Sequence, residues 1–247
     1  MISKYAVVET SSIGVGVRIG EFAVIRAGVV LGDGCVIHPH VVIEEGVTIG
    51  AGVEIFPGAL IGKEPKGAGA TSRSIIFDRR VVIGEHSSIG PHAVIFYDVE
   101  IGDHTLIGDG ASIREQCRIG SYCIISRYVT VNYNTTIGDH TRVMDLTHIT
   151  GNCRIGRNVF ISLQVGMAND NSVGKQDYNN NMLGPVIHDE AMIGVGAVLL
   201  PNIVIGNGAI VAAGSVVNHD VADHVMVAGI PSRFVKRLRP EQPEEER

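Results

Sequence analysis

The chain has 247 residues, and its 26 acidic against 20 basic side chains give a net charge of −6, which argues against nucleic acid as the main partner. It contains no apolar run long enough to span a membrane, and no signal peptide is visible. Tryptophan is absent and aromatic residues make up only 5%, which suits a core too narrow for large rings.

An aliphatic residue returns every six residues along most of the chain. The first run extends from Ile13 to Ile61, the middle run from Ile83 to Ile161, and the last from Ile187 to Val217. The residue two places earlier is usually small, as at Ala111 and Thr135. Because side chains alternate along a strand, both positions point inward from one short strand. Hexapeptide repeats of this kind are typical of a parallel β-helix.

Three six-residue units make one coil with three flat faces. We therefore predict an all-β fold, a left-handed parallel β-helix of about ten coils and on the order of 50 Å tall at a strand spacing of about 4.8 Å. The β-helix domain is expected over residues 1–220, with long loop excursions near 63–80 and 164–185. Residues 221–239 are expected to form a C-terminal strand or short helix, and residues 240–247 a disordered tail. The flat outer faces predict a homotrimer with ligand sites between subunits.

The residue after each repeated aliphatic differs among the three faces. On one face it is glycine throughout the middle coils, from Gly84 to Gly156. On the other two faces residues larger than glycine appear at this position in the middle coils. The residues are Gly90, Gly108, Ser126, Met144 and Ser162 on one face, and Phe96, Arg114, Asn132 and Thr150 on the other. We expect the functional residues to lie along the two edges that carry these side chains.

The four cysteines all occupy the small inward position. Cys35, Cys117, Cys123 and Cys153 each lie two residues before a repeated aliphatic. They are predicted to be buried, unreactive thiols rather than disulfides or nucleophiles. Free thiols are consistent with a reducing, cytoplasmic setting.

The first break in the repeat is a basic segment. It contains Lys63, Lys66, Arg73, Arg79 and Arg80. Lys and Arg pair well with phosphate, so the segment is either a clamp for an anion, with Lys66 and Arg73 binding substrate, or a solvated surface loop. The second break is rich in asparagine, a residue of turns and hydrogen bonds.

Polar residues also gather in the middle coils. Arg114 and Glu115 lie one coil below Asn132 and Asn134. Such an outward stack either lines a groove for a polar substrate or forms contacts between subunits, and both interpretations stay open.

His148 is the only histidine that directly precedes a repeated aliphatic, whereas His86, His92, His104 and His140 occupy corner positions. His148 directly precedes Ile149, so it is predicted to point outward from a strand, with Asp145 three residues earlier. A histidine held by a carboxylate can act as a general base, although an interface histidine fits the same position. His86 and His104 lie one coil apart in the same register and could share a zinc site, but no third ligand is obvious.

Three further stretches carry a resemblance to a known family. They are DLTHITGNCRIGRNVFISLQVGMANDNSVGK, GPVIHDEAMIGVGAVLLPNIVIGNGAIVAAGSVV and VAGIPSRFVKRL, together with the IGKEPKG segment of the first break. With the repeat, these resemble the hexapeptide-repeat acyltransferases, and among them the N-acyltransferases of nucleotide-linked amino sugars. The similarity extends over nearly the whole chain. The long C-terminal helical domain of the lipid-A-type acyltransferases is not seen here, which argues against an acyl-carrier-protein donor.

The resemblance implies acyl-CoA, usually acetyl-CoA, as donor and a dTDP- or UDP-linked amino-deoxysugar as acceptor, with no metal. It implies a CoA site along the later coils, formed by Asn169, Asn171, Gly196, Ala197, Ala213, Gly214, Arg233 and Lys236. The alternatives are a CoA-dependent sugar O-acetyltransferase, a zinc-dependent hydratase of the same fold, and a non-catalytic β-helix scaffold. The two loops and the decorated coils argue against the scaffold.

Overall fold

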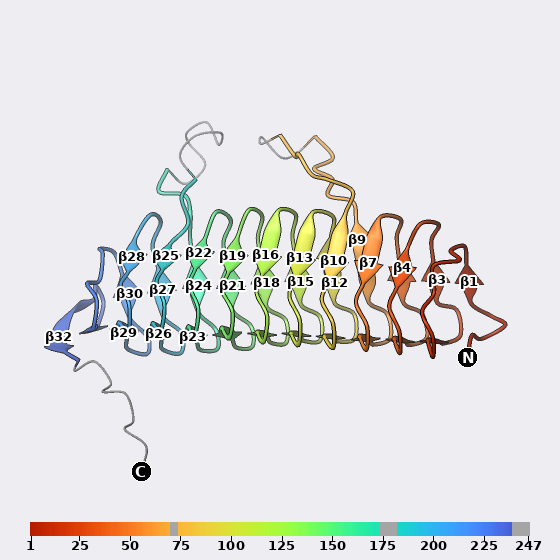
Figure 1. Ribbon diagram of the computed structural model, residues 1–247. Coiled ribbons are helices and arrows are strands. Elements are labelled where there is room, and N and C mark those ends of the chain that lie inside the picture. Colours follow the sequence, from red (N-terminus) through yellow and green to blue (C-terminus); the bar gives the residue numbers. More distant parts are fainter. Residues whose placement is uncertain (70–73, 173–181, 239–247) are drawn as a thin grey trace, which may run out of the picture.

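The computed structural model describes residues 1–69, 74–172 and 182–238, and its regular structure there is entirely β-strand. The strands stack into three long sheets that form the sides of an elongated prism (Figure 1). We name them sheet A with 12 strands, sheet B with 11 and sheet C with 9. The chain passes from A to B to C in each coil, so the prism has an A–B, a B–C and a C–A corner.

The strands are short, most of them two or three residues. Sheet A contains β2 (Arg18–Ile19), β5 (Val36–Ile37), β8 (Glu54–Ile55), β11 (Ser88–Ile89), β14 (Leu106–Ile107), β17 (Ile124–Ile125), β20 (Arg142–Val143), β23 (Phe160–Ile161), β26 (Met192–Ile193), β29 (Ile210–Val211), β31 (Val225–Ala228) and β32 (Arg233–Arg237). Sheet B contains β1 (Val7–Val8), β3 (Val24–Ile25), β6 (Val42–Ile43), β9 (Leu60–Lys63), β12 (Val94–Phe96), β15 (Ser112–Ile113), β18 (Thr130–Val131), β21 (His148–Ile149), β24 (Gly166–Met167), β27 (Val198–Leu199) and β30 (Val216–Val217). Sheet C contains β4 (Val30–Leu31), β7 (Val47–Ile49), β10 (Val81–Ile83), β13 (Val99–Ile101), β16 (Cys117–Ile119), β19 (Thr136–Ile137), β22 (Arg154–Ile155), β25 (Val186–Ile187) and β28 (Val204–Ile205).

The six-residue repeat is the inward face of these ladders, as predicted. Ile89 pairs with Ile107 and Ile113 with Val131, each from one coil to the next, and all four side chains are fully buried. Burying one such side chain contributes roughly 1.5–3 kcal/mol relative to leaving it exposed. The parallel β-helix is therefore confirmed, whereas its left-handed sense remains a prediction.

The four cysteines are buried and free, which confirms their predicted position in the core. Burial raises the pKa of Cys117 and Cys153 to about 12 and that of Cys123 to about 11. Because the thiolate is the reactive form, these thiols are poor nucleophiles at neutral pH.

The corner histidines hold strained turn positions. His86, His104 and His140 have φ angles of 55°, 53° and 59°, in the left-handed region that side chains other than glycine seldom adopt. His86, His104, Tyr122 and His140 stack as a column of rings at the C–A corner, with neighbouring centroids 4.8–5.1 Å apart. Within the described residues, no group of three or more His, Cys, Asp or Glu is arranged to hold a metal ion.

Glycine follows every strand of sheet C except β25, which His188 follows, and close stacking of the coils accounts for it. A Cβ atom added to Gly102 would lie 2.6 Å from the backbone nitrogen of Ser121 and 2.7 Å from the carbonyl carbon of Gly120. The backbone of the next coil leaves no room for a side chain at this first position of the C–A corner.

Gly102→Ala is expected to destabilise the protein by about 1–3 kcal/mol or more, because the added methyl group must displace backbone in the next coil. Chemical denaturation should show the loss. Gly166→Ala is the control, since a Cβ there meets nothing within 4 Å, and equal stability of the two variants would contradict this account.

The C-terminal segment is a β-hairpin, so of the two forms expected for residues 221–239 the strand is found and the short helix is wrong. β31 and β32 pair antiparallel, with Ala228 opposite Arg233, and β31 continues sheet A beyond β29. Pro231 disfavours helical backbone at the residue before it, and β31 also satisfies hydrogen-bonding groups at the open end of the ladder.

The start of the second excursion and the number of coils also differ from the prediction, whereas the first excursion lies where it was expected. The second excursion begins after β24, at Ala168 rather than at residue 164, and the first begins after Lys63. Pairing continues below Ile13 and beyond Val217, which adds turns to the ten expected. The described residues include no helix of the length and apolar character needed to cross a membrane. The predicted tail at residues 240–247 lies outside the described residues.

Candidate functional site

His148 lies on the outer surface of sheet B, as predicted. It is exposed at the start of β21 and pairs with Thr130 of β18 on one side and Gly166 of β24 on the other. Its Nδ1 atom is 2.7 Å from the hydroxyl oxygen of Thr130. Although the residue is exposed on the outer face, neighbouring atoms remove part of the water around the ring, and this desolvation lowers the pKa of His148 below its ordinary value of 6.5. The imidazole is therefore neutral at pH 7 and able to accept a proton.

Asp145 does not contact His148, and the predicted His–Asp pair is wrong. Its carboxylate accepts hydrogen bonds from the Ser126 hydroxyl, the Arg127 backbone N–H at 3.1 Å and the Arg127 guanidinium at 2.5 Å. The Ser126 hydroxyl first, and then Arg127, hold the pKa of Asp145 below its usual value. Asp145 is thus a corner carboxylate that binds the coil below, as Asp139 does for the Ser121 N–H at 2.8 Å.

An open space adjoins His148 on the side of the later coils. Gly166 has no side chain, and a Cβ there would meet nothing within 4 Å. Beyond it lies Val198, 38% exposed, and Leu163 and Val195 on the A–B corner are 42% and 40% exposed. The histidine thus faces a small opening followed by an apolar surface, which suits an uncharged acyl or thioester group.

The two excursions leave the prism at the same corner. Both connect sheet B to sheet C, the first between β9 and β10 and the second between β24 and β25 (Figure 1). The corners that follow β12, β15, β18 and β21 lie between them, and these are the corners that carry Phe96, Arg114, Asn132 and Thr150. Of the two edges expected to be functional, the B–C edge therefore lies between the two excursions.

Arg114 is fixed on this edge by a buried carboxylate. Glu115 is fully buried and accepts contacts from Nε and Nη2 of Arg114 at 3.1 and 3.2 Å. The guanidinium carbon lies 5.5 Å from the ring centre of Phe96. Glu115 therefore positions Arg114, rather than offering its own carboxylate to a ligand as the sequence suggested.

The asparagines hold the base of the second excursion. The Asn169 side-chain amide donates to the Gly151 carbonyl at 3.2 Å and to the Tyr133 hydroxyl at 3.5 Å. Asn134 donates to Asn152 at 2.7 Å, and Asn152 donates to the Met182 carbonyl at 2.5 Å. These amide N–H groups already donate hydrogen bonds at the base of the second excursion. The Asn132 side chain, in contrast, has no partner among the described residues.

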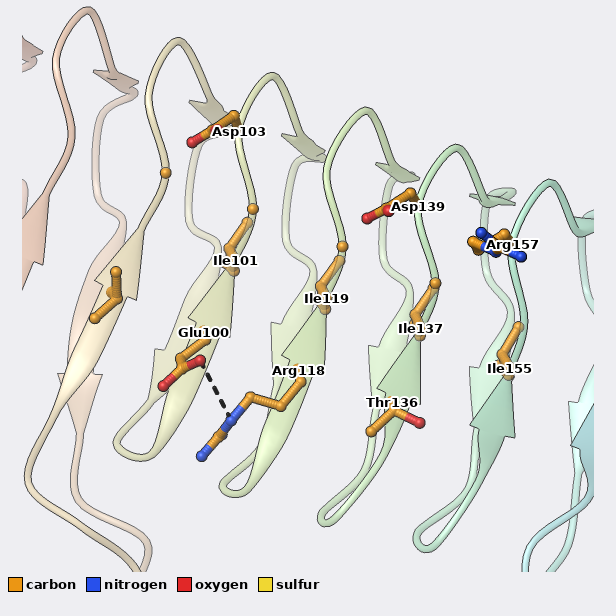
Figure 2. Close-up of a pocket in the computed structure, with 15 residues that line it drawn as sticks. Glu100, Ile101, Asp103, Arg118, Ile119, Thr136, Ile137, Asp139, Ile155 and Arg157 are labelled. Atoms are coloured by element: carbon orange, nitrogen blue, oxygen red, sulfur yellow. Dashed lines mark ion pairs between the residues drawn. The ribbon is translucent and has the colours of Figure 1, made fainter.

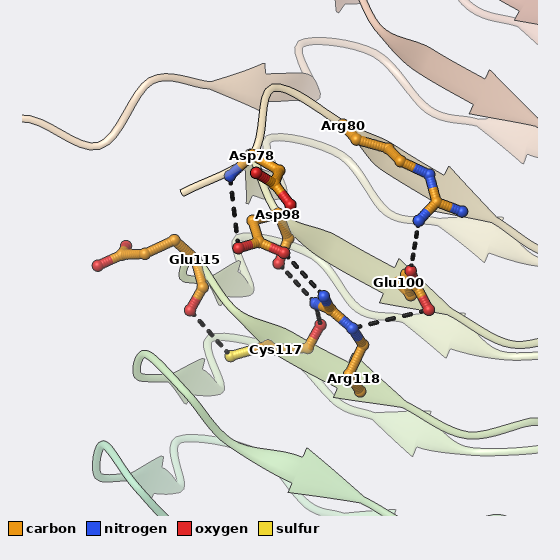
Figure 3. Close-up of polar contacts among 7 residues, drawn as sticks. All are labelled: Asp78, Arg80, Asp98, Glu100, Glu115, Cys117 and Arg118. Carbon is orange, nitrogen blue, oxygen red and sulfur yellow. Dashed lines mark hydrogen bonds and ion pairs between the residues drawn. The ribbon is translucent and has the colours of Figure 1, made fainter. Parts of the chain in front are cut away.

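Arg118 of sheet C and Arg80, which directly precedes β10, hold the same corner from the side of sheet C. Arg118 donates to the Asp98 carbonyl and carboxylate, each at 2.8 Å, and Arg80 contacts Glu100 at 2.7 Å (Figure 3). Asp98 also accepts from the Asp78 backbone at 3.5 Å, which ties the returning end of the first excursion to the prism. The corner is thus rigidly supported, as a functional site on a scaffold requires.

The cations of the first excursion are mostly paired. Arg79 contacts Glu64 at 2.6 Å and Glu45 at 3.4 Å, and Lys66 lies 3.8 Å from Glu64. Exposed pairs of this kind contribute little stability, and they also lessen the attraction for an anion. Arg73 lies outside the described residues.

The residues expected to bind CoA fall into separate groups. Gly196 and Gly214 are open A–B corners of successive coils, where a Cβ would meet nothing within 4 Å, and Ala213 is exposed beside them. Asn171 is exposed at the second excursion. Ala197 is fully buried, so its side chain cannot line a surface groove.

The C-terminal hairpin carries a cavity of about 450 Å³, lined by Arg233, Arg237, Phe234 and His219 among others. Lys236 does not line it and instead lies opposite Met226 on β32. Arg237, rather than Lys236, is the second cation that lines this cavity beside Arg233.

A larger groove of about 530 Å³ runs over sheet C and the C–A corner (Figure 2). Glu100, Arg118, Thr136 and Arg157 line it, and none of the predicted site residues does. Sequence reasoning did not place Thr130 and Gly166 beside His148, where the structure has them. Thr130 and Gly166 could have been found from the sequence, because each lies three repeats from His148, one before it and one after it.

Comparison with known proteins agrees with this architecture. The model of the family "Bacterial transferase hexapeptide (six repeats)" matches residues 10–45, 28–63, 98–132 and 184–219, just over half of the chain. UDP-N-acetylglucosamine acyltransferase from Arabidopsis has the same fold, with a TM-score of 0.61 and 22% identity over 96% of this chain and 74% of that one. The Bacteroides fragilis 9343 enzyme of that name gives a TM-score of 0.54 and 20% identity over the same shares.

Curated relatives match over a shorter stretch. The 2,3,4,5-tetrahydropyridine-2,6-dicarboxylate N-acetyltransferase of Clostridium perfringens (strain SM101 / Type A) is 47% identical over 53 residues, 22% of each chain. The serine acetyltransferase of Bacillus pumilus (strain SAFR-032) is 53% identical over 51 residues, 21% of this chain and 24% of that one. The match thus spans less than a quarter of these relatives' own length. With the repeat, the three parallel sheets and the family match in agreement, the chain belongs to the bacterial transferase hexapeptide family.

Proposed function

We propose that the protein transfers an acyl group, acetyl first of all, from acyl-CoA to the amino group of a dTDP- or UDP-linked amino-deoxysugar. The observation that carries the proposal is His148, a neutral, outward histidine held by Thr130 next to the open space at Gly166. Membership of the hexapeptide transferase family supports acyl transfer as the reaction class. The resemblance of the sequence to amino-sugar N-acyltransferases supports the acceptor.

In the proposed reaction, the sugar amine attacks the thioester carbonyl and forms a tetrahedral intermediate. When His148 donates from Nδ1–H to Thr130, its Nε2 atom is left unprotonated and can take the proton from the amine. The tetrahedral intermediate then collapses to the amide: the C–S bond breaks, and the departing CoA sulfur takes up the proton from His148, which leaves CoA as a thiol and the imidazole neutral again. The rate therefore rests on the alignment of amine and thioester as well as on the base.

The donor is expected on the side of the later coils. The apolar surface of Val198 and Leu163 suits the acyl end and the pantetheine arm, and the open corners Gly196 and Gly214 leave room beside them. Arg233 and Arg237 at the C-terminal cavity are the cations available for phosphates of CoA. We also propose that the protein is a cytoplasmic homotrimer with its sites between subunits. The buried, free thiols support the cytoplasmic setting, and the flat sheets support the packing of subunits side by side.

Calorimetric titration with CoA, and then with dTDP and UDP separately, tests this proposal. Micromolar CoA binding together with a preference for one nucleotide is expected. Binding of CoA without either nucleotide would point to another acceptor, and failure of the folded protein to bind CoA would overturn acyl transfer.

The pKa of His148 is expected below 6.5, because burial disfavours the charged ring. A base that must be neutral then stays competent as the pH falls to that pKa and is lost below it. Titration of the histidine ring signals by NMR, with His148→Ala to assign the resonance, measures this directly. A pKa at or above 6.5 would contradict the expected environment.

A further inference from the structure

Lys63 and Arg114 lie on either side of Phe96 at the B–C corner. Lys63 pairs with Phe96 across the ladder, and its ammonium nitrogen is 4.5 Å from the ring centre. Arg114 follows in the next coil, 5.5 Å from the same ring. Phe96 is only 8% exposed, so it forms a firm apolar base under both cations.

These cations keep hydrogen-bonding capacity for a ligand. Lys63 forms no ion pair with another described residue, and the nearby carboxylates Glu64 and Glu44 contact Arg79 and Arg26 instead. Arg114 uses Nε and Nη2 on Glu115, which leaves Nη1 available. A buried carboxylate thus fixes the guanidinium while a lysine beside it adds a full positive charge.

The spacing relates this cation pair to His148. Arg114 lies on the corner after β15, and His148 begins β21, two coils later. Two coils correspond to about 10 Å along the prism at the usual strand spacing. An extended arginine side chain together with one sugar ring is long enough to cover this distance between the two coils. Asn132 lies in the intervening coil, and its amide can meet sugar hydroxyls because no other described residue engages it.

We propose that Lys63 and Arg114 bind the diphosphate of the acceptor, which places its amino group at His148 from the side of the earlier coils. The inference rests on the proposed function, and it assigns acceptor and donor to opposite sides of the histidine. Arginine and lysine are the side chains suited to phosphate oxygens, and a diphosphate offers several acceptors within one group.

Calorimetry on the full-length protein tests the site, with inorganic pyrophosphate, dTDP, UDP and CoA as separate probes. Lys63→Met and Arg114→Met are each expected to weaken binding of the preferred nucleoside diphosphate at least tenfold and to leave CoA affinity unchanged. Lys4→Met, which alters another lysine over a ring, and Arg142→Met, an exposed arginine of sheet A, are the matched controls and should bind like the wild type.

The outcomes separate this inference from the proposed function. Nucleotide affinity equal to wild type in both variants, with acetyl transfer intact, would overturn the diphosphate site alone. An equal loss of CoA affinity would show that the two cations bind the donor, and it would also overturn the diphosphate site. Nucleotide binding that depends on Lys63 and Arg114, in a protein that binds no CoA, would support the site and overturn acyl transfer.

Discussion

His148→Ala is expected to lower kcat for acyl transfer by at least about a hundredfold, the usual contribution of a positioned general base. KM for donor and acceptor should change little, because the proton is transferred only in the reaction step. Steady-state rates of CoA release, with the acceptor saturating, measure the effect. Thr130→Val should reproduce part of the loss, since the ring would lose the hydroxyl that orients it.

His140→Ala is the matched control, because His140 is a corner histidine in the ring column of the C–A edge. Its rate should equal that of the wild type. A mild loss of rate in His148→Ala would exclude the base and leave alignment and the thiolate to carry the reaction. A sugar hydroxyl as acceptor depends more strictly on a base than an amine does, so His148→Ala should abolish that alternative reaction.

Gly166→Leu is expected to reduce kcat/KM for acetyl-CoA by about a hundredfold or more, because the side chain would fill the opening beside His148 and misplace the thioester. Folding should be preserved, since a Cβ at Gly166 meets nothing within 4 Å. The smaller Gly166→Ala should keep acetyl transfer and disfavour longer acyl chains. Rates with acetyl-, propionyl- and butyryl-CoA measure both effects.

Arg18→Leu is the comparison for this series, because it places the same side chain on an exposed strand position of sheet A in an early coil. It should leave the rates unchanged. Wild-type rates in Gly166→Leu would show that the reacting thioester lies elsewhere.

The fold could be predicted because one physical rule governs nearly every residue. Alternation along a strand and repetition of the same register from coil to coil decide together which side chains enter the core. The same arithmetic places Cys117 inward, His148 outward and Arg114 on an edge, and the structure agrees for each. It also brings Thr130 and Gly166 beside His148.

The errors arise where hydrogen bonding, rather than periodicity, decides the arrangement. Closeness in sequence suggested that Asp145 holds His148, but a corner carboxylate is directed to backbone N–H groups of the coil below, as Asp33 is to the Val15 N–H at 2.7 Å. The amide of Asn169 is likewise used to hold its own loop. The C-terminal segment became a hairpin because the end of a ladder offers hydrogen-bond partners that a lone short helix lacks.

The most direct test of acyl transfer at His148 is release of the CoA thiol by the full-length protein, supplied with acetyl-CoA and a panel of dTDP- and UDP-linked amino sugars. We expect release that requires one nucleotide-linked amine, yields the N-acetylated sugar in equal amount and falls at least about a hundredfold in His148→Ala. A folded protein that binds CoA but acetylates none of these amines would contradict the proposed acceptor. Equal rates in wild type and His148→Ala would contradict the assignment of the base.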